Sequence, residues 1–235
     1  MADLSREAGR LVAVPLGALA RWRSGKPMHP RGAVFDAVLE RHGGTWGVPF
    51  LDAAAREPVV VRLSRGAGLP APLPDLLGIA VRLGADSAAP VDLLLSSTGR
   101  GALTRLLPVL RNDAATVYSS IMAYSSAAGP LRLAALPLTD DVPSDPGPLA
   151  GAARTRPLVF ELAAARGREA WRPFGRLTIG EPAEPLDPDL RFDAVRRPPP
   201  GLVPDGPLAR FRAPAYAVSQ RARSGSQAGS VIGIG

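Results

Sequence analysis

The sequence has no cysteine, which excludes disulfide bonds, a thiolate nucleophile and any cysteine-ligated metal. It has only two histidines, His29 and His42, too few for a zinc hydrolase site with several histidine ligands. Glycine-containing stretches occur, but none carries the lysine of a phosphate-binding loop, and no G-x-S-x-G nucleophile motif is present. These absences exclude the commonest hydrolase and nucleotide-binding classes.

Long hydrophobic runs are also missing. The apolar run nearest the start, residues 11–20, contains Pro15 and Gly17, and a bilayer span needs about 20 apolar residues. Asp3 and Glu7 stand where a signal peptide would carry basic residues. We therefore expect no membrane span and a cytoplasmic protein.

Lysine is nearly absent, because Lys26 is the only one and the remaining basic residues are arginines. The net charge of +7 invites a nucleic-acid interpretation, but the arginines are scattered and form no long basic run. We expect no nucleic-acid partner. Aromatic residues make up only 5% and hydrophobic residues 46%, so a core of leucine, valine and alanine is predicted.

Runs of β-branched and apolar residues bounded by proline and glycine predict strands at six places: 58–64, 78–83, 91–96, 131–138, 157–165 and 175–179. Helical spacing of apolar residues predicts helices over 1–25, 33–42 and, in two pieces, 101–126. Helices that cluster before and between strands, without βαβ alternation, indicate an α+β fold. We expect a single domain built as an antiparallel β-barrel with flanking helices.

Two proline-rich stretches are expected to be loops. Residues 140–150 form a connector, and residues 181–207 form a long extended segment around Pro198–Pro200. A loop of that length in a compact domain wraps a surface or has a function. Whether it wraps the chain's own barrel or a neighbour stays open. Residues 224–235 are rich in glycine and serine and predict a flexible tail.

Several short motifs follow one another in a specific order. They are His29-Pro30-Arg31-Gly32-Ala33, the strand ending Arg62-Leu63-Ser64, the run Asp75–Arg82, the stretch Ser96-Ser97-Thr98-Gly99, and Arg212 with Tyr216, Arg221 and Arg223. In content and order they resemble the motifs of catalases and smaller catalase-like haem proteins. The resemblance implies a barrel domain over residues 26–223 that binds haem b.

The resemblance also implies roles for individual residues. Tyr216 would be the iron ligand, as a tyrosinate whose charged form Arg212 favours from four residues earlier. His29 would move the peroxide proton as a general acid and base, with Ser64 orienting its ring. Lys26, Arg62 and Arg223 would pair with the haem propionates.

Ser96 departs from the family pattern. The family has an asparagine there that donates a hydrogen bond to bound peroxide, and a serine hydroxyl is shorter and aimed differently. Ser97 or Thr98 would compensate, depending on the register of the strand. We expect a weak catalase or peroxidase that consumes hydrogen peroxide or a small organic hydroperoxide.

Two alternatives stay open at this stage. In one, the fold carries or senses haem with little turnover. In the other, haem is lost, and the chain binds another apolar ligand, acts as an interaction module or has an unrelated hydrolase activity. The sequence does not decide the oligomeric state, a homo-oligomer included.

Overall fold

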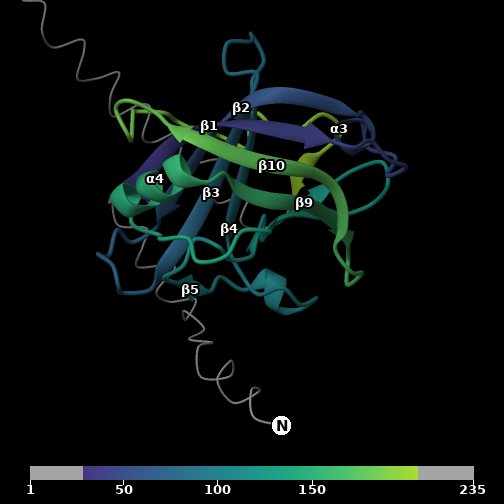
Figure 1. Cartoon of the computed structure of the whole chain (residues 1–235). Helices are drawn as coiled ribbons and strands as arrows, with labels where there is room; N and C mark the ends of the chain where they lie inside the picture. The colour runs from purple at the N-terminus through teal and green to yellow at the C-terminus, as the bar shows by residue number, and fades with distance from the viewer. Residues whose placement is uncertain (1–28, 206–235) are drawn as a thin grey trace, which may run out of the picture.

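The computed structural model describes residues 29–205, which form one domain built on a closed, eight-stranded antiparallel β-barrel (Figure 1). The ring runs β8–β6–β4–β3–β2–β1–β10–β9, and a ladder between β9 and β8 closes it. Its strands are β1 (Arg31–Arg41), β2 (Ala55–Arg65), β3 (Asp75–Leu83), β4 (Val91–Ser97), β6 (Tyr118–Ser119), β8 (Leu131–Pro137), β9 (Leu158–Arg166) and β10 (Arg172–Pro182).

Smaller elements decorate this ring. The strand β5 (Leu110–Arg111) pairs with β3, while β7 (Ala123–Ser125) and β11 (Val203–Asp205) extend the sheet beyond β8. The helices are α3 (Pro49–Asp52), the 3₁₀ turn η1 (Thr104–Leu106) and α4 (Pro146–Thr155), which lies against the outside of the barrel (Figure 1). No helix within residues 29–205 combines the length and the apolarity that crossing a bilayer requires.

The predicted barrel and six of its strands are confirmed. The runs predicted at 58–64, 78–83, 91–96, 131–138, 157–165 and 175–179 correspond to β2, β3, β4, β8, β9 and β10. In β2 the residues Val59, Val61 and Leu63 point inward, and their neighbours face outward. This period of two is what a half-buried strand requires. The predicted helix over 1–25 and the tail 224–235 lie outside the described residues.

The helix predicted over 33–42 is wrong, since this stretch belongs to strand β1. Ala33, Phe35, Ala37 and Leu39 point into the barrel, and β1 pairs along its whole length with β2. Val34, on the opposite face, is buried as well. The proline-rich segment that follows β10 covers it from outside, and the Val34 backbone exchanges hydrogen bonds with Ala183 and Leu186 of that segment. Burial on both faces hides the alternation and produces apolar spacing that mimics a helix.

The two helices predicted within 101–126 are also wrong. The stretch contains only the turn η1 and the short strands β5, β6 and β7. Pro108 would interrupt the first helix, and instead it forms an isolated bridge with Thr98. The second half of this stretch pairs through β6 with both β4 and β8. Hydrogen bonding between strands therefore overrides a weak local preference for helix. The connector predicted at 140–150 contains the start of α4, where Pro146 and Pro148 fit the first turn.

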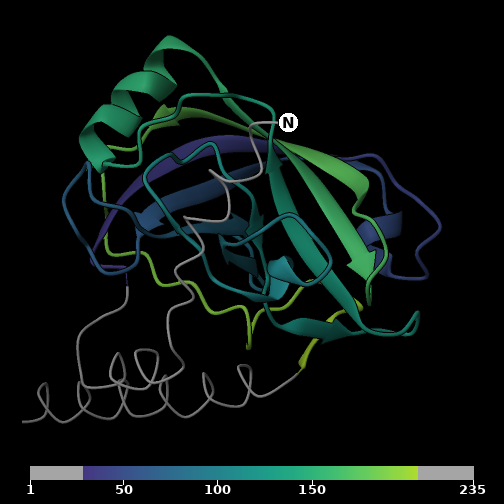
Figure 2. The same ribbon diagram turned by 90° about the horizontal axis from the view of Figure 1, so that it is seen from below.

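The proline-rich segment covers the barrel's own outer wall (Figure 2, yellow-green). The carbonyl oxygen of Leu186 accepts a hydrogen bond from the backbone N–H of Val34 at 2.8 Å. Further along, the backbone N–H of Asp193 donates to the Asp92 carboxylate at 2.7 Å, and the Phe192 ring packs under the Arg82 guanidinium at 4.8 Å. Residues 183–197 are therefore fixed against the outer face of β1 to β4, and this stretch is called the strap below.

Candidate functional site

His29 lies just before β1 and is bonded to the side chain of Ser64 near the end of β2. Its ring nitrogen Nδ1 lies 2.9 Å from the Ser64 hydroxyl oxygen. That hydroxyl also points toward the carbonyl oxygen of Gly78, at 3.5 Å. When the hydroxyl donates to this carbonyl, Nδ1 donates to the hydroxyl, and the other nitrogen, Nε2, is the proton acceptor. The structure thus brings together the two residues predicted to form the acid–base pair.

Gly78 on β3 provides the space in which the imidazole sits. A methyl group at this position would lie 2.8 Å from Cε1 of His29, 3.1 Å from the Ser64 hydroxyl and 3.2 Å from Nδ1. Real side chains do not approach that closely, so glycine is needed for the ring to lie against the sheet. Sequence reasoning placed Gly78 inside a motif but did not recognise this role, which the pairing of Gly78 with Ser64 between β2 and β3 reveals.

The backbone of His29 is held in the left-handed region, with φ of +62°. A residue with a side chain pays about 1–2 kcal/mol for this conformation, so the surroundings must enforce it. Its N–H donates to the carbonyl oxygen of Gly66 at 3.0 Å, and its own carbonyl oxygen accepts a hydrogen bond from Arg62 Nη2 at 3.1 Å. The imidazole is therefore aimed by a strained backbone that is fixed on both sides.

Arg62 faces outward from β2 and binds a carboxylate of the strap. Its Nε and Nη2 atoms lie 2.7 and 2.8 Å from the two carboxylate oxygens of Asp187. The guanidinium lies over Gly32 on β1, where a methyl group would come within 2.6 Å of it. The anion that Arg62 contacts therefore lies within the chain, on a residue that sequence reasoning did not single out.

Ser96 lies on β4 in the same row of the sheet as the His29 site. It is paired with Gly78 on one side and with Ser119 of β6 on the other. Directly paired residues point to the same face of a sheet, so the side chains of Ser64 and Ser96 flank Gly78 on the outer wall. Ser97 points the other way, donating to the Val109 carbonyl at 2.7 Å and accepting from the Leu77 N–H at 3.0 Å. Its hydroxyl is occupied by the fold, so it does not replace Ser96.

Two of the three tyrosines are core residues. Tyr118 and Tyr124 are fully buried, and Tyr118 donates its hydroxyl proton to the Ala114 carbonyl at 2.9 Å. Burial, assisted by the negative charge of Asp113, raises the pKa of Tyr118 far above its ordinary value and keeps the phenol neutral. The predicted ligand Tyr216 lies outside the described residues, as do Arg212, Lys26 and Arg223.

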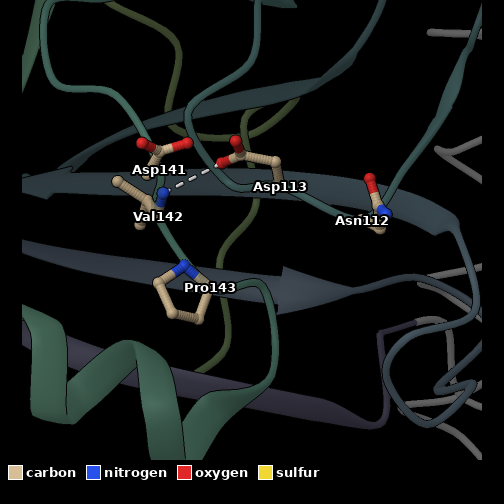
Figure 3. A pocket seen from close by; sticks show the side chains of 5 residues that line it. All are labelled: Asn112, Asp113, Asp141, Val142 and Pro143. Carbon is tan, nitrogen blue, oxygen red and sulfur yellow. Dashed lines mark hydrogen bonds between the residues drawn. The ribbon is translucent and has the colours of Figure 1, made fainter.

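No cluster of three or more histidine, aspartate or glutamate side chains suited to a metal ion occurs within residues 29–205. A surface pocket of about 340 Å³ is lined by Asn112, Asp113, Asp141, Val142 and Pro143 (Figure 3). The Asp113 carboxylate accepts hydrogen bonds from the backbone N–H groups of Val142 and Ala115, at 3.1 and 2.7 Å. It is thus engaged in holding its loops together. None of the predicted site residues lines this pocket, which we interpret as structural.

The sequence matches no protein-family profile and no curated protein. Among solved structures, the barrel is similar to the crystal structure of a fungal catalase, with a TM-score of 0.53 and 13% sequence identity. The match covers 84% of this chain and 60% of the catalase chain, so this chain spans less than two thirds of that enzyme. At this identity the likeness establishes the fold alone: the described residues adopt a barrel of the catalase type.

Proposed function

We propose that this chain is a haem-dependent enzyme that consumes peroxide, acting as a weak catalase or peroxidase on hydrogen peroxide or a small organic hydroperoxide. The observation that carries the proposal is the 2.9 Å contact between His29 Nδ1 and the Ser64 hydroxyl, on the outer wall of a catalase-type barrel. A histidine with a strained backbone and an oriented ring is a costly arrangement for a purely structural role.

In this proposal His29 handles the proton of the bound peroxide. Its Nε2 takes the proton from one peroxide oxygen and delivers it to the other, which is general acid–base work. Ser64 fixes the tautomer through Nδ1, and Gly78 leaves the ring room to lie against the sheet.

The described residues fit one wall of a haem site. They offer an oriented imidazole and hydroxyls on a row of the sheet, with glycine between them. They offer no tyrosinate, because Tyr118 and Tyr124 are buried in the core, so the iron ligand in this proposal is Tyr216, and Arg212 favours its charged form. Lys26 and Arg223 would hold the propionates, whereas the Arg62 guanidinium already binds the Asp187 carboxylate. Haem, when bound, supplies the redox chemistry of peroxide cleavage.

Ser96 limits the rate in this proposal. A hydroxyl beside Gly78 is shorter than the amide it replaces, and one well-placed donor is worth about 10²–10³ in kcat at comparable sites. Slow turnover, or a larger hydroperoxide that reaches the hydroxyl, follows from this loss.

In the first test, the full chain is titrated with hemin and the visible absorption spectrum of the mixture is recorded. We expect a Soret band that is absent in Tyr216→Phe. We also expect peroxide-dependent oxidation of a dye that is lost in His29→Ala while the Soret band remains. His42→Ala is the matched control and should keep the wild-type rate. The proposal fails if wild type shows no Soret band, or if His29→Ala oxidises the dye as fast as wild type.

A second candidate is a carrier of haem or another apolar ligand on the same fold. The ion pair between Arg62 and Asp187 favours it, because this guanidinium is already neutralised by the chain itself. A carrier would show a Soret band, or bind an apolar fluorescent probe, without peroxide turnover in wild type. Dye oxidation that depends on His29 would exclude this candidate.

A further inference from the structure

Within residues 29–205, Arg105 is a buried cation without a counter-ion. It lies in the turn η1 and is only 2% exposed, yet no carboxylate comes within 4 Å of its guanidinium anywhere in the described part of the chain. The other well-buried arginine, Arg65, lies 3.8 Å from the carboxylate of Asp75. Burying an unpaired charge is costly, so proteins pair such groups with an anion.

The hydrogen bonds of Arg105 leave one of its nitrogens unused. Nη2 donates to the Glu169 carbonyl at 2.8 Å and Nε makes a long contact with the Gly101 carbonyl at 3.3 Å. The Trp171 ring lies 4.2 Å from the guanidinium carbon. Nη1 is buried and has no acceptor among residues 29–205, and the same holds for the buried hydroxyl of Thr98, at the start of the same loop. A buried guanidinium donor without an acceptor is a vacant hydrogen-bonding position that the oxygen of a water or of an anion can fill.

A second arginine, Arg132, adds to the uncompensated positive charge at Arg105. Arg132 on β8 is a second cation whose charge acts on Arg105, and its Nε donates to the Ile121 carbonyl at 3.2 Å. Desolvation, and then repulsion from Arg132, hold the pKa of Arg105 below its ordinary value. Arg132 forms no ion pair among the described residues and is partly exposed, so an anion could approach from its side.

We propose that the guanidinium groups of Arg105 and Arg132 bind an oxyanion, a phosphate or carboxylate group, at the outer wall beside Trp171. Planar guanidinium groups match the geometry of such anions, and Nη1 of Arg105 supplies the vacant donor. Trp171 covers the other face of the guanidinium, and its indole N–H is fixed by the Arg100 carbonyl at 3.0 Å. This site shares no side chain with the proposed peroxide chemistry, which uses His29, Ser64 and Ser96.

The experiment is isothermal titration of the full chain with inorganic phosphate and, separately, with acetate, at constant ionic strength. We expect saturable binding of at least one of the two probes, at one site per chain. Arg132→Gln should weaken it about tenfold or more. Arg168→Gln is the matched control, because Arg168 is exposed on the hairpin that follows β9, and it should bind as wild type does.

Thermal unfolding provides the second readout, since a ligand bound only by the folded state raises Tm. The bound probe should raise Tm in wild type and in Arg168→Gln, and not in Arg132→Gln. The proposal is overturned if neither probe binds saturably, or if Arg168→Gln loses affinity as much as Arg132→Gln. Equal loss of affinity in Arg168→Gln would mean that the anion is attracted to the basic surface in general and not to a specific site. Arg105→Gln tests the buried donor directly, provided that its circular dichroism matches wild type.

Discussion

Arg62 and Asp187, which are 125 residues apart in the sequence, form a two-point ion pair across the outer face of the barrel, at 2.7 and 2.8 Å. The pair joins β2 to the strap and leaves the Arg62 side chain only 15% exposed. The same guanidinium donates to the His29 carbonyl. The strap, the sheet and the strained histidine are thus connected through one side chain.

Asp187→Asn should lower the free energy of unfolding by about 2 kcal/mol, because it leaves a largely buried guanidinium without its anion. Urea unfolding followed by circular dichroism measures this loss. Asp189→Asn is the matched control, since Asp189 pairs with Arg191 in the same strap at a highly exposed position, and it should cost less than about 0.5 kcal/mol. Equal losses in the two variants would mean that the Arg62 pair contributes no more than a surface contact.

The sequence predicted strands from runs of β-branched and apolar residues bounded by proline and glycine. In β2 the residues Val59, Val61 and Leu63 of such a run alternate with outward residues, so this strand was recognisable. The strand β1 was not, because the strap covers Val34 from outside and removes the contrast between the faces. Contacts between segments 150 residues apart leave no local signal, and a single sequence cannot supply them.

The site was predictable to the extent that short motifs carry it. His29 and Ser64 were both named from their motifs, and they lie in contact. Gly78 and Asp187 were not recognised, because their roles depend on register across β2 and β3 and on the course of the strap. A glycine that faces a serine across two strands becomes informative only when the pairing is known.

Gly78→Ala should displace the His29 ring. The added methyl group would lie 2.8 Å from Cε1, and the ring cannot retreat easily because the His29 backbone is held at Gly66. Loss of the hydrogen bond to Ser64 should cost about 1 kcal/mol of stability and shift the imidazole nitrogen resonances of His29 in NMR spectra. Unchanged His29 resonances would contradict the close contact.

Gly151→Ala provides the control for this substitution. Gly151 lies in the middle of α4, and no atom of residues 29–205 lies within 4 Å of the added methyl group, so this change should raise stability by about 0.5–1 kcal/mol. The opposite signs separate the steric effect at Gly78 from the general effect of replacing glycine by alanine.

The loss of stability at acid pH should depend on Asp52. Backbone hydrogen bonds lower its pKa, the largest contribution coming from the Trp46 N–H, with Val48 and Gly47 adding to it. A carboxyl group whose pKa is lower in the folded state stabilises the protein fully above its unfolded pKa, about 3.9. That contribution is lost as the pH falls through the folded value.

Asp52→Asn should therefore destabilise the protein at neutral pH and have a flatter stability curve below about pH 4, measured by urea unfolding at a series of pH values. The amide keeps the shape of the side chain but has only one acceptor oxygen for the Trp46 and Val48 N–H groups. Curves for wild type and variant that run parallel through the acid range would exclude Asp52 as a source of the pH dependence.

Ser96→Asn tests whether the departure at this position sets the rate of the proposed reaction. Asparagine would extend an amide donor beside Gly78, on the face where the Ser64 hydroxyl orients His29. With hemin bound, we expect kcat for hydrogen peroxide to rise about 10²-fold, since this is the worth of one well-aimed donor in a comparable site. The Soret band and hemin affinity should stay unchanged, because Ser96 has no proposed role in holding haem.

Ser96→Ala should lose most of the residual activity. If Ser96→Asn and Ser96→Ala both turn over as wild type does, the hydroxyl at position 96 takes no part in peroxide chemistry and the slow step lies elsewhere.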